Sequence, residues 1–141
     1  MPSEDKKQVA RAYLESFSDQ TGEATLALLA DSALIQIMAP SAGTTLPKGM
    51  TKSEYRTFRQ QERPKFLPNG VRHEVRSMIS EGDIVAAETE CFADLPGGAV
   101  YNNVFHFAFE IRDGLIQASR EYTDILYAKE TLGIGRAQDE P

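Results

Sequence analysis

Four stretches of alternating apolar and polar residues, each bounded by a turn sequence, most constrain the fold of this chain. The stretches span residues 71–80, 84–93, 100–111 and 115–123. The intervening segments are Glu81-Gly82-Asp83, Leu95-Pro96-Gly97-Gly98 and Arg112-Asp113-Gly114. Short glycine-containing segments between such runs are typical of hairpin turns. Consecutive strands with short connections predict an antiparallel meander.

The N-terminal half has the pattern of helices. Ser3 can cap a first helix, in which Val9, Tyr13 and Phe17 recur at helical spacing. A short second helix is expected over residues 23–30, followed by a buried strand over residues 33–38.

A third helix is expected to begin at a capping box formed by Thr51 and Glu54 and to weaken near Pro64. Its neighbourhood is rich in basic residues, namely Lys52, Arg56, Arg59, Arg63, Lys65 and Arg72. These residues form either a solvated outer face that pairs with acids elsewhere or a surface that attracts an anionic ligand or an acidic partner.

Length and charge exclude several classes of protein. The 141 residues fit a single domain, expected over residues 1–132 with a disordered tail at 133–141. The net charge of −6 argues against nucleic-acid binding. Neither a signal peptide nor an apolar run long enough for a membrane span is visible, so a cytoplasmic protein is expected.

Metal and disulfide chemistry is also disfavoured by composition. Cys91 is the single cysteine, and only two histidines, His73 and His106, accompany it. These residues are too few for an internal disulfide or a transition-metal site. A metal site made of carboxylates alone stays possible but has no spacing signature in this sequence, so no metal and no cofactor are predicted.

Helices followed by an antiparallel sheet predict an α+β domain in which the helices cover one face of the sheet. On the longest strand, the alternating residues Tyr101, Asn103, Phe105, Phe107 and Phe109 point one way. His106 and its even-numbered neighbours point the other way. An aromatic face of this size can line an apolar cavity if the sheet curls around it.

Three segments carry a family resemblance. The segments 101–110, 113–116 and 120–124 (Arg120-Glu121-Tyr122-Thr123-Asp124) resemble the SnoaL-like group of the ketosteroid-isomerase and nuclear-transport-factor superfamily. The order of elements matches over residues 4–132. The resemblance implies a cone-shaped fold with three helices on a strongly curved, mainly antiparallel sheet, an interior pocket, and a homodimer formed through the outer sheet face.

Matching the family residue by residue gives two catalytic candidates. Tyr13 aligns with the tyrosine that donates to the substrate oxygen in steroid isomerases, but the positions of their two acids hold apolar residues, one of which is Phe107. The arginine–aspartate pair of limonene epoxide hydrolases aligns with Thr89 and Cys91 and is therefore absent. The aspartate that closes the last strand in that group is matched by Asp124.

Asp124 is accordingly the predicted proton carrier, expected to share the cavity face with Tyr122 and Arg120. Desolvation there would raise its pKa and make it a useful acid or base. The alternative is that Asp124 pairs with Arg120 or caps the closing helix. Tyr13 is either a hydrogen-bond donor in the pocket or a core residue.

The remaining predicted pocket residues are mostly aromatic or small. They are Phe17, Tyr55, Phe58, Thr89, Cys91, Asn103, Phe105, Phe107 and Tyr122. Asn103 either orients a ligand or braces a neighbouring strand, and the phenylalanines are either cavity wall or core.

Several charged residues are expected outside this set. His106 is expected on the outer face with Glu110, and with Glu121 across the hairpin. Glu88 and Glu90 should also point outward and pair with Arg72 or Arg76. Glu62 interrupts the apolar face of the third helix and could reach the pocket mouth.

The favoured function is a cofactor-independent acid–base enzyme of isomerase or cyclase type, acting on a small hydrophobic oxygenated ring compound such as a polyketide or terpenoid. The first alternative is a non-catalytic protein that binds a hydrophobic small molecule or serves as a dimeric scaffold. The second alternative is an epoxide hydrolase with rearranged catalytic groups.

Overall fold

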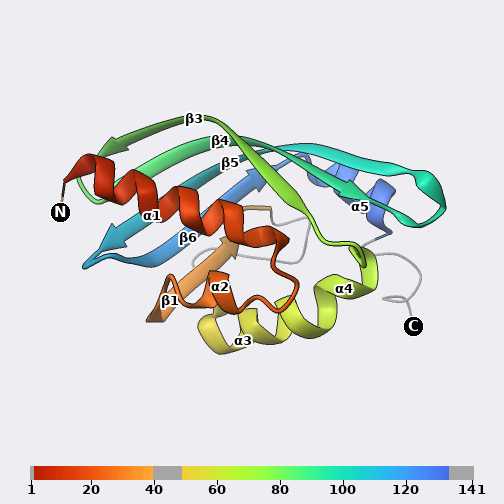
Figure 1. The fold of residues 1–141 in the computed structure, drawn as a ribbon, viewed down its shortest axis with the longest axis horizontal. Coiled ribbons are helices and arrows are strands. Elements are labelled where there is room, and N and C mark those ends of the chain that lie inside the picture. The colour runs from red at the N-terminus through yellow and green to blue at the C-terminus, as the bar shows by residue number, and fades with distance from the viewer. Residues whose placement is uncertain (1, 40–48, 134–141) are drawn as a thin grey trace.

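One six-stranded sheet forms the frame of the computed structural model, which describes residues 2–39 and 49–133 (Figure 1). Its order is β2-β1-β6-β5-β4-β3, and only the β1–β6 pairing is parallel. The strands are β1 (Leu29–Ile37), β2 (Met50–Thr51), β3 (Arg72–Glu81), β4 (Ile84–Asp94), β5 (Val100–Arg112) and β6 (Leu115–Thr123). The predicted four-strand meander is confirmed as β3 to β6.

Helices pack against this sheet and close its inner face. They are α1 (Ser3–Glu15), α2 (Glu23–Leu26), α3 (Lys52–Thr57), α4 (Arg63–Phe66) and α5 (Ile125–Leu132). Figure 1 shows α1 lying along the sheet beside β3, while α2 and α3 lie near β1 and α4 follows α3 on the way to β3. Helix α5 lies by the far ends of the long strands. The predicted α+β class with helices on a curved sheet is confirmed.

The boundary between the second helix and the first strand differs from the prediction. The helix ends at Leu26 rather than near residue 30, and the strand begins at Leu29 rather than Ala33. Leu29 is paired with Ile116 of β6. Pairing in the sheet and burial of Leu29 therefore override the weak helical preference of this short segment.

The third helix begins as predicted, because both hydrogen bonds of the Thr51–Glu54 capping box are present. It then widens into a π-helical turn, Phe58–Glu62, before continuing as α4. Pro64 has no N–H to donate to the preceding turn, and a wider turn accommodates such a residue. Helix α5 is capped at its C-terminus by Gly133, which has φ of 73°. The rest of the predicted tail lies outside the described residues.

The inner face of β5 carries the predicted aromatic stripe. Tyr101, Asn103, Phe107 and Phe109 are all buried, and the rings of Phe105, Phe107 and Phe109 stack at centroid distances of 5.6 and 5.4 Å. Tyr13 of α1 contacts Phe109 edge-on at 5.3 Å. The stripe therefore forms the floor on which α1 packs.

A β-bulge in β6 changes which residues face this floor. Ile111 pairs with Ile116, but the next residue of β5, Glu110, pairs with Ala118, so Gln117 is an extra residue without a partner. Because side chains alternate along a strand, one extra residue exchanges the two faces for every position beyond it.

The bulge corrects the sequence-based assignment of faces in β6. Ser119 lies opposite Phe109, Glu121 opposite Phe107 and Thr123 opposite Phe105, so this set faces inward. Arg120 and Tyr122 lie opposite outward-facing residues of β5. The expectation that Arg120 and Tyr122 share the cavity face is wrong, and so is the expectation that Glu121 lies beside His106.

Deleting Gln117 tests the importance of this register. Without the extra residue, β6 could keep its pairing with β5 only if the side chains of Glu121 and Ser119 turned outward. They could stay inward only if that pairing were broken. We expect the deletion to lower the free energy of unfolding by more than about 3 kcal/mol, the scale of disrupting a packed core. Urea titration measures the loss. Gln117→Ala keeps the residue count and loses only hydrogen bonds to two backbone carbonyls, so it should cost about 1 kcal/mol. Similar losses for both variants would contradict this account.

Candidate active site

Glu121 is the acidic group that the fold places on the inner face of the sheet. Its backbone is fixed on both sides, by Phe107 of β5 and by Ile37 of β1. Burial raises the pKa of its carboxyl to about 7, and Arg63 opposes the shift only in part. A carboxyl with this pKa exchanges a proton readily near neutral pH.

Three buried phenol groups lie near enough to this carboxyl for its charge to act on them. Tyr13 comes from α1, Tyr55 from α3 and Tyr101 from β5, and all three are buried. Burial raises the pKa of each, and the charge of Glu121 raises it further. The hydroxyls therefore stay protonated and are available as hydrogen-bond donors. The structure brings Tyr13, a predicted donor, to the same cluster as Tyr55, a predicted pocket residue.

Two arginines enter the interior from the third helical segment. Arg59 is fully buried and Arg63 is 3% exposed, so they are not part of a solvated face. Arg59 donates to Thr25 Oγ1 at 2.7 Å and to the Asp19 carbonyl at 2.7 Å. Arg63 donates to the Phe17 carbonyl at 2.8 Å and to Gln20 Oε1 at 2.9 Å. These bonds hold the segment after α1 against the third helix.

His73 occupies the aromatic side of the same interior. Its Nδ1 lies 2.8 Å from Thr89 Oγ1, and its ring packs edge-on against Phe17 and Phe105, both at 4.9 Å. Burial lowers its pKa to about 3, so the ring is neutral at physiological pH. Thr89, predicted to contact substrate, therefore holds His73.

Asp124, the predicted proton carrier, lies elsewhere. Its carboxylate accepts a hydrogen bond of 3.0 Å from the backbone N–H of Tyr127 and so caps α5. The side chain is exposed, and the expectation that it lines the interior is wrong. The bulge at Gln117 is the reason, because it turns Tyr122 outward together with the residues two positions before and after it along the chain, including Asp124.

The other predicted pocket residues divide into three groups. Phe17, Phe107 and Cys91 are buried core or interior residues, and burial raises the pKa of the Cys91 thiol to about 11. Phe58 and Phe105 are partly buried against them. Tyr122 is 45% exposed on the outer face.

Asn103 acts as a brace in this structure. Its amide nitrogen donates to the Tyr101 hydroxyl at 2.8 Å and to the Asp124 carbonyl at 3.1 Å, and its oxygen accepts from the Val104 backbone. These contacts tie the inner face of β5 to the start of α5, which also stacks Tyr127 on Tyr101 at 5.4 Å.

Charged residues of the outer face are mostly paired. Arg76 bonds Glu90 at 2.5 Å, as predicted, and Arg120 bonds Glu110 at 2.9 Å. His106 is exposed and contacts Tyr122 edge-on, which confirms its outward orientation. Glu62 is exposed and paired with Lys65, so it does not reach the interior.

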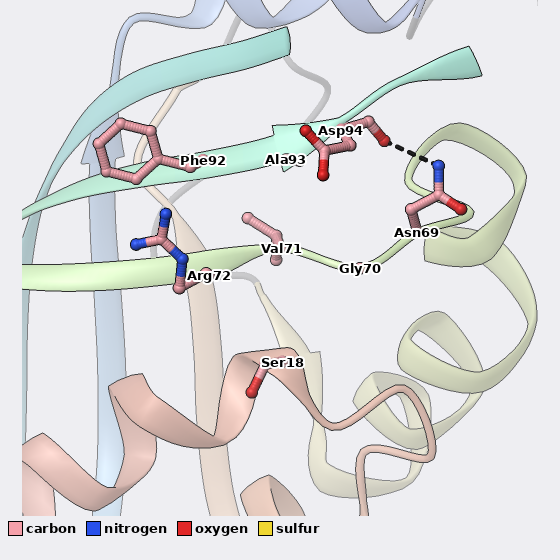
Figure 2. Close-up of a pocket in the computed structure, with 8 residues that line it drawn as sticks. All are labelled: Ser18, Asn69, Gly70, Val71, Arg72, Phe92, Ala93 and Asp94. Carbon is pink, nitrogen blue, oxygen red and sulfur yellow. Dashed lines mark hydrogen bonds between the residues drawn. The ribbon is translucent and has the colours of Figure 1, made fainter. Parts of the chain in front are cut away.

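Two surface hollows lie away from the interior cluster. Figure 2 shows the first, of 180 Å³, where Asn69 donates to the Asp94 carbonyl at 3.0 Å. Its other polar side chains include Arg72, whose guanidinium lies over the ring of Phe92 at 4.7 Å. The second hollow, of 480 Å³, lies on the outer sheet face and includes His106, Tyr122 and Asp124.

Within residues 2–39 and 49–133, no group of three or more histidine, cysteine or acidic side chains is arranged to hold a metal ion. Over the same residues, no helix is both long and apolar enough to cross a membrane.

Sequence reasoning missed Glu121, Arg59 and Arg63 as interior residues. Arg59 and Arg63 did carry a signal, since residues four apart lie on one face of a helix and Tyr55 belongs to the same series. Glu121 carried none, because its orientation depends on a bulge that no local residue pattern marks.

The raised pKa of Glu121 predicts how stability depends on pH. The folded state holds this proton more tightly than the unfolded chain, so the contribution is present below the ordinary pKa of 4.5 and is lost as pH rises towards 7. Glu121→Gln keeps a neutral side chain, so its free energy of unfolding relative to wild type should rise by about 2–3 kcal/mol between pH 4 and 8. Urea titrations across this range measure the difference.

His73 acts in the opposite direction, since its lowered pKa makes stability rise with pH between about 3 and 6.5, and comparison with wild type cancels this effect. Glu62→Gln, an exposed acid, is the matched control and should follow the wild-type curve. A constant difference between Glu121→Gln and wild type would contradict the assignment.

The sequence profile of the SnoaL-like domain matches residues 10–119. No curated protein sequence matches the chain. Among solved structures, PrhC from Penicillium brasilianum has a TM-score of 0.81 at 21% identity, covering 97% of this chain and 91% of PrhC.

TerC, crystallised with polyporic acid, has a TM-score of 0.77 at 18% identity, and the match covers 92% of this chain and 98% of TerC. IdmH from Streptomyces antibioticus, a proposed polyketide cyclase, has a TM-score of 0.74 at 18% identity, and the match covers 92% of this chain and 99% of IdmH. These likenesses show the shared fold, and the profile match places the chain in the SnoaL-like family.

Proposed function

We propose that the chain is an acid–base enzyme of isomerase or cyclase type, working without a cofactor on a small hydrophobic ring compound that carries a carbonyl or related oxygen. The observation that carries the proposal is the position of Glu121: an ionisable carboxyl on the inner sheet face, with its pKa near 7, among three protonated phenols. Support for the reaction type comes from the SnoaL-like profile and from similarity to a proposed polyketide cyclase.

The proposed step is a proton transfer next to a carbonyl group. The Glu121 carboxylate takes a proton from carbon, and the electron pair of that C–H bond moves into the carbonyl to form an enolate. Tyr13 or Tyr55 donates a hydrogen bond to the enolate oxygen, where negative charge develops. Protonated Glu121 then returns its proton to another carbon. Alternatively, the enolate carbon attacks a second carbonyl to close a ring, and Glu121 returns its proton to the alkoxide that forms.

In this proposal the proton carrier is Glu121 rather than Asp124, which lies three residues later in the sequence. An exposed carboxylate that caps a helix has neither the desolvation nor the position to serve an interior ligand. Glu121 has both, and it retains partial exposure through which protons can exchange with solvent.

Exchange of α-hydrogens of cyclic ketones in D₂O, followed by NMR, tests this step without knowledge of the natural substrate; 2-tetralone and its ring-size analogues form the panel. We expect Glu121→Gln to lower the catalysed rate by about 10²-fold or more, the usual contribution of a general base. The wild-type rate should rise with pH through about 7, as Glu121 ionises.

Asp124→Asn is the matched control, because asparagine caps helices as well as aspartate does, and its rate should stay within about threefold of wild type. A rate lost in Asp124→Asn and kept in Glu121→Gln would return the catalytic role to Asp124. Absence of exchange with the whole panel would favour the non-catalytic binding protein.

We also propose that the chain forms a homodimer through the outer sheet face. Val104 is 63% exposed there and lines the same hollow as Tyr122, and Val100, farther along β5, is 53% exposed. Burying such side chains is favourable by about 1.5–3 kcal/mol each. Val104→Glu should therefore shift the sedimentation coefficient from dimer to monomer at micromolar concentration, whereas Thr57→Glu, at an exposed position of helix α3, should not. A wild-type monomer at that concentration would refute the proposal.

A further inference from the structure

The interior of the fold contains more buried positive charge than buried negative charge. Arg59 and Arg63 are 0% and 3% exposed, whereas Arg56 and Lys65 of the same helical segment are exposed and paired with Glu23 and Glu62. Within the described residues, neither buried guanidinium lies within 4.0 Å of a carboxylate. The usual pairing of arginine with acid is therefore found on the outside of the segment and missing on the inside.

The hydrogen bonds of these two arginines are incomplete. Their Nη atoms donate to neutral acceptors: backbone carbonyls, the hydroxyls of Thr25 and Tyr55, and the Gln20 amide. The Nε atoms of both Arg59 and Arg63 are buried and have no partner among the described residues. Because a buried charged donor without an acceptor is costly, most such groups in proteins have a partner.

The surrounding groups do not supply the missing charge. Glu121 is one carboxylate for two guanidiniums, and it is partly protonated at neutral pH. Asp19 lies near, but its carboxylate already accepts bonds from Thr21 and from the Ala24 backbone. His73 is neutral, and the phenols Tyr13 and Tyr55 remain protonated. Burial lowers the pKa of Arg63 to about 10, which still leaves it charged at pH 7.

We propose that the interior site takes ligands with an acidic oxygen on a hydrophobic ring, as an enolate, phenolate or carboxylate, and that Arg63, backed by Arg59, holds the negative charge. The proposal rests on the interior being the ligand site, as the proposed function requires. It adds a substrate class, because an acidic enol or phenol enters such a site as its anion and a neutral ether of the same shape does not gain this charge interaction.

Two probes of nearly the same shape separate charge from hydrophobic contact. 2-Hydroxy-1,4-naphthoquinone is an anion at pH 7.5, and 2-methoxy-1,4-naphthoquinone is neutral. We expect calorimetric titration of the wild-type protein to show at least about tenfold tighter binding of the anion, as charge-assisted hydrogen bonds to arginine are stronger than neutral ones. Equal affinity for the two probes would overturn the proposal.

Variants of the third helical segment assign the preference to a residue. Arg63→Gln should reduce the preference below about threefold, and Arg63→Lys, which keeps the charge, should preserve most of it. Arg56→Gln, at an exposed arginine of α3, should behave as wild type. A full preference in folded Arg63→Gln would overturn the assignment. If that variant does not fold, loss of the preference in Arg63→Lys would overturn it instead.

Glu121→Gln distinguishes this proposal from the proposed catalytic step. Removing a negative charge beside Arg63 should leave the anion bound as tightly as in wild type or more tightly, while ketone exchange is lost. Ketone exchange that survives in Glu121→Gln would refute the acid–base step and leave the anion preference standing. An anion preference absent from wild type would refute the charge proposal and leave the acid–base step standing.

Discussion

The pairing of β5 with β6 determines the chemistry of the interior, because one unpaired residue decides which side chains of β6 face inward. With Gln117 bulged, Ser119, Glu121 and Thr123 lie opposite the phenylalanines of β5. Without the bulge, Arg120 and Tyr122 would occupy that face. The stacked rings hold the register, since every slip by one residue would move Phe107 or its partner out of the core.

Once turned inward, Glu121 takes its chemical character from what surrounds it. Desolvation favours its neutral form, and Arg63 favours its charged form, so its pKa settles near 7 rather than at either extreme. The phenols of Tyr13 and Tyr55 resist ionisation in the same environment and remain donors. A single low-dielectric interior thus provides a carboxyl that gives and takes protons, next to hydroxyls that only donate hydrogen bonds.

The fold could be predicted from sequence because its signals are local and repeated. Alternation marks β3 to β6, the Thr51–Glu54 box marks α3, and the family resemblance gives their arrangement. The site could be predicted only where a residue's face follows from its own strand or helix, as for Tyr13 and Tyr55. Glu121 and Asp124 exchange environments through a bulge, which depends on pairing between strands and leaves no mark in the order of residues.

Charged side chains are paired on the outer surface but not in the interior, and stability alone does not explain this difference. Outer ion pairs such as Arg76–Glu90 are exposed to solvent, where such pairs stabilise a fold only weakly. Arg59 and Arg63 are buried with no carboxylate of the described residues within 4.0 Å, an arrangement whose desolvation cost is several kcal/mol per ion. Their bonds to backbone carbonyls after α1 could be made by neutral side chains at a lower cost. Two full charges in this position are accounted for when a negatively charged ligand completes the interior.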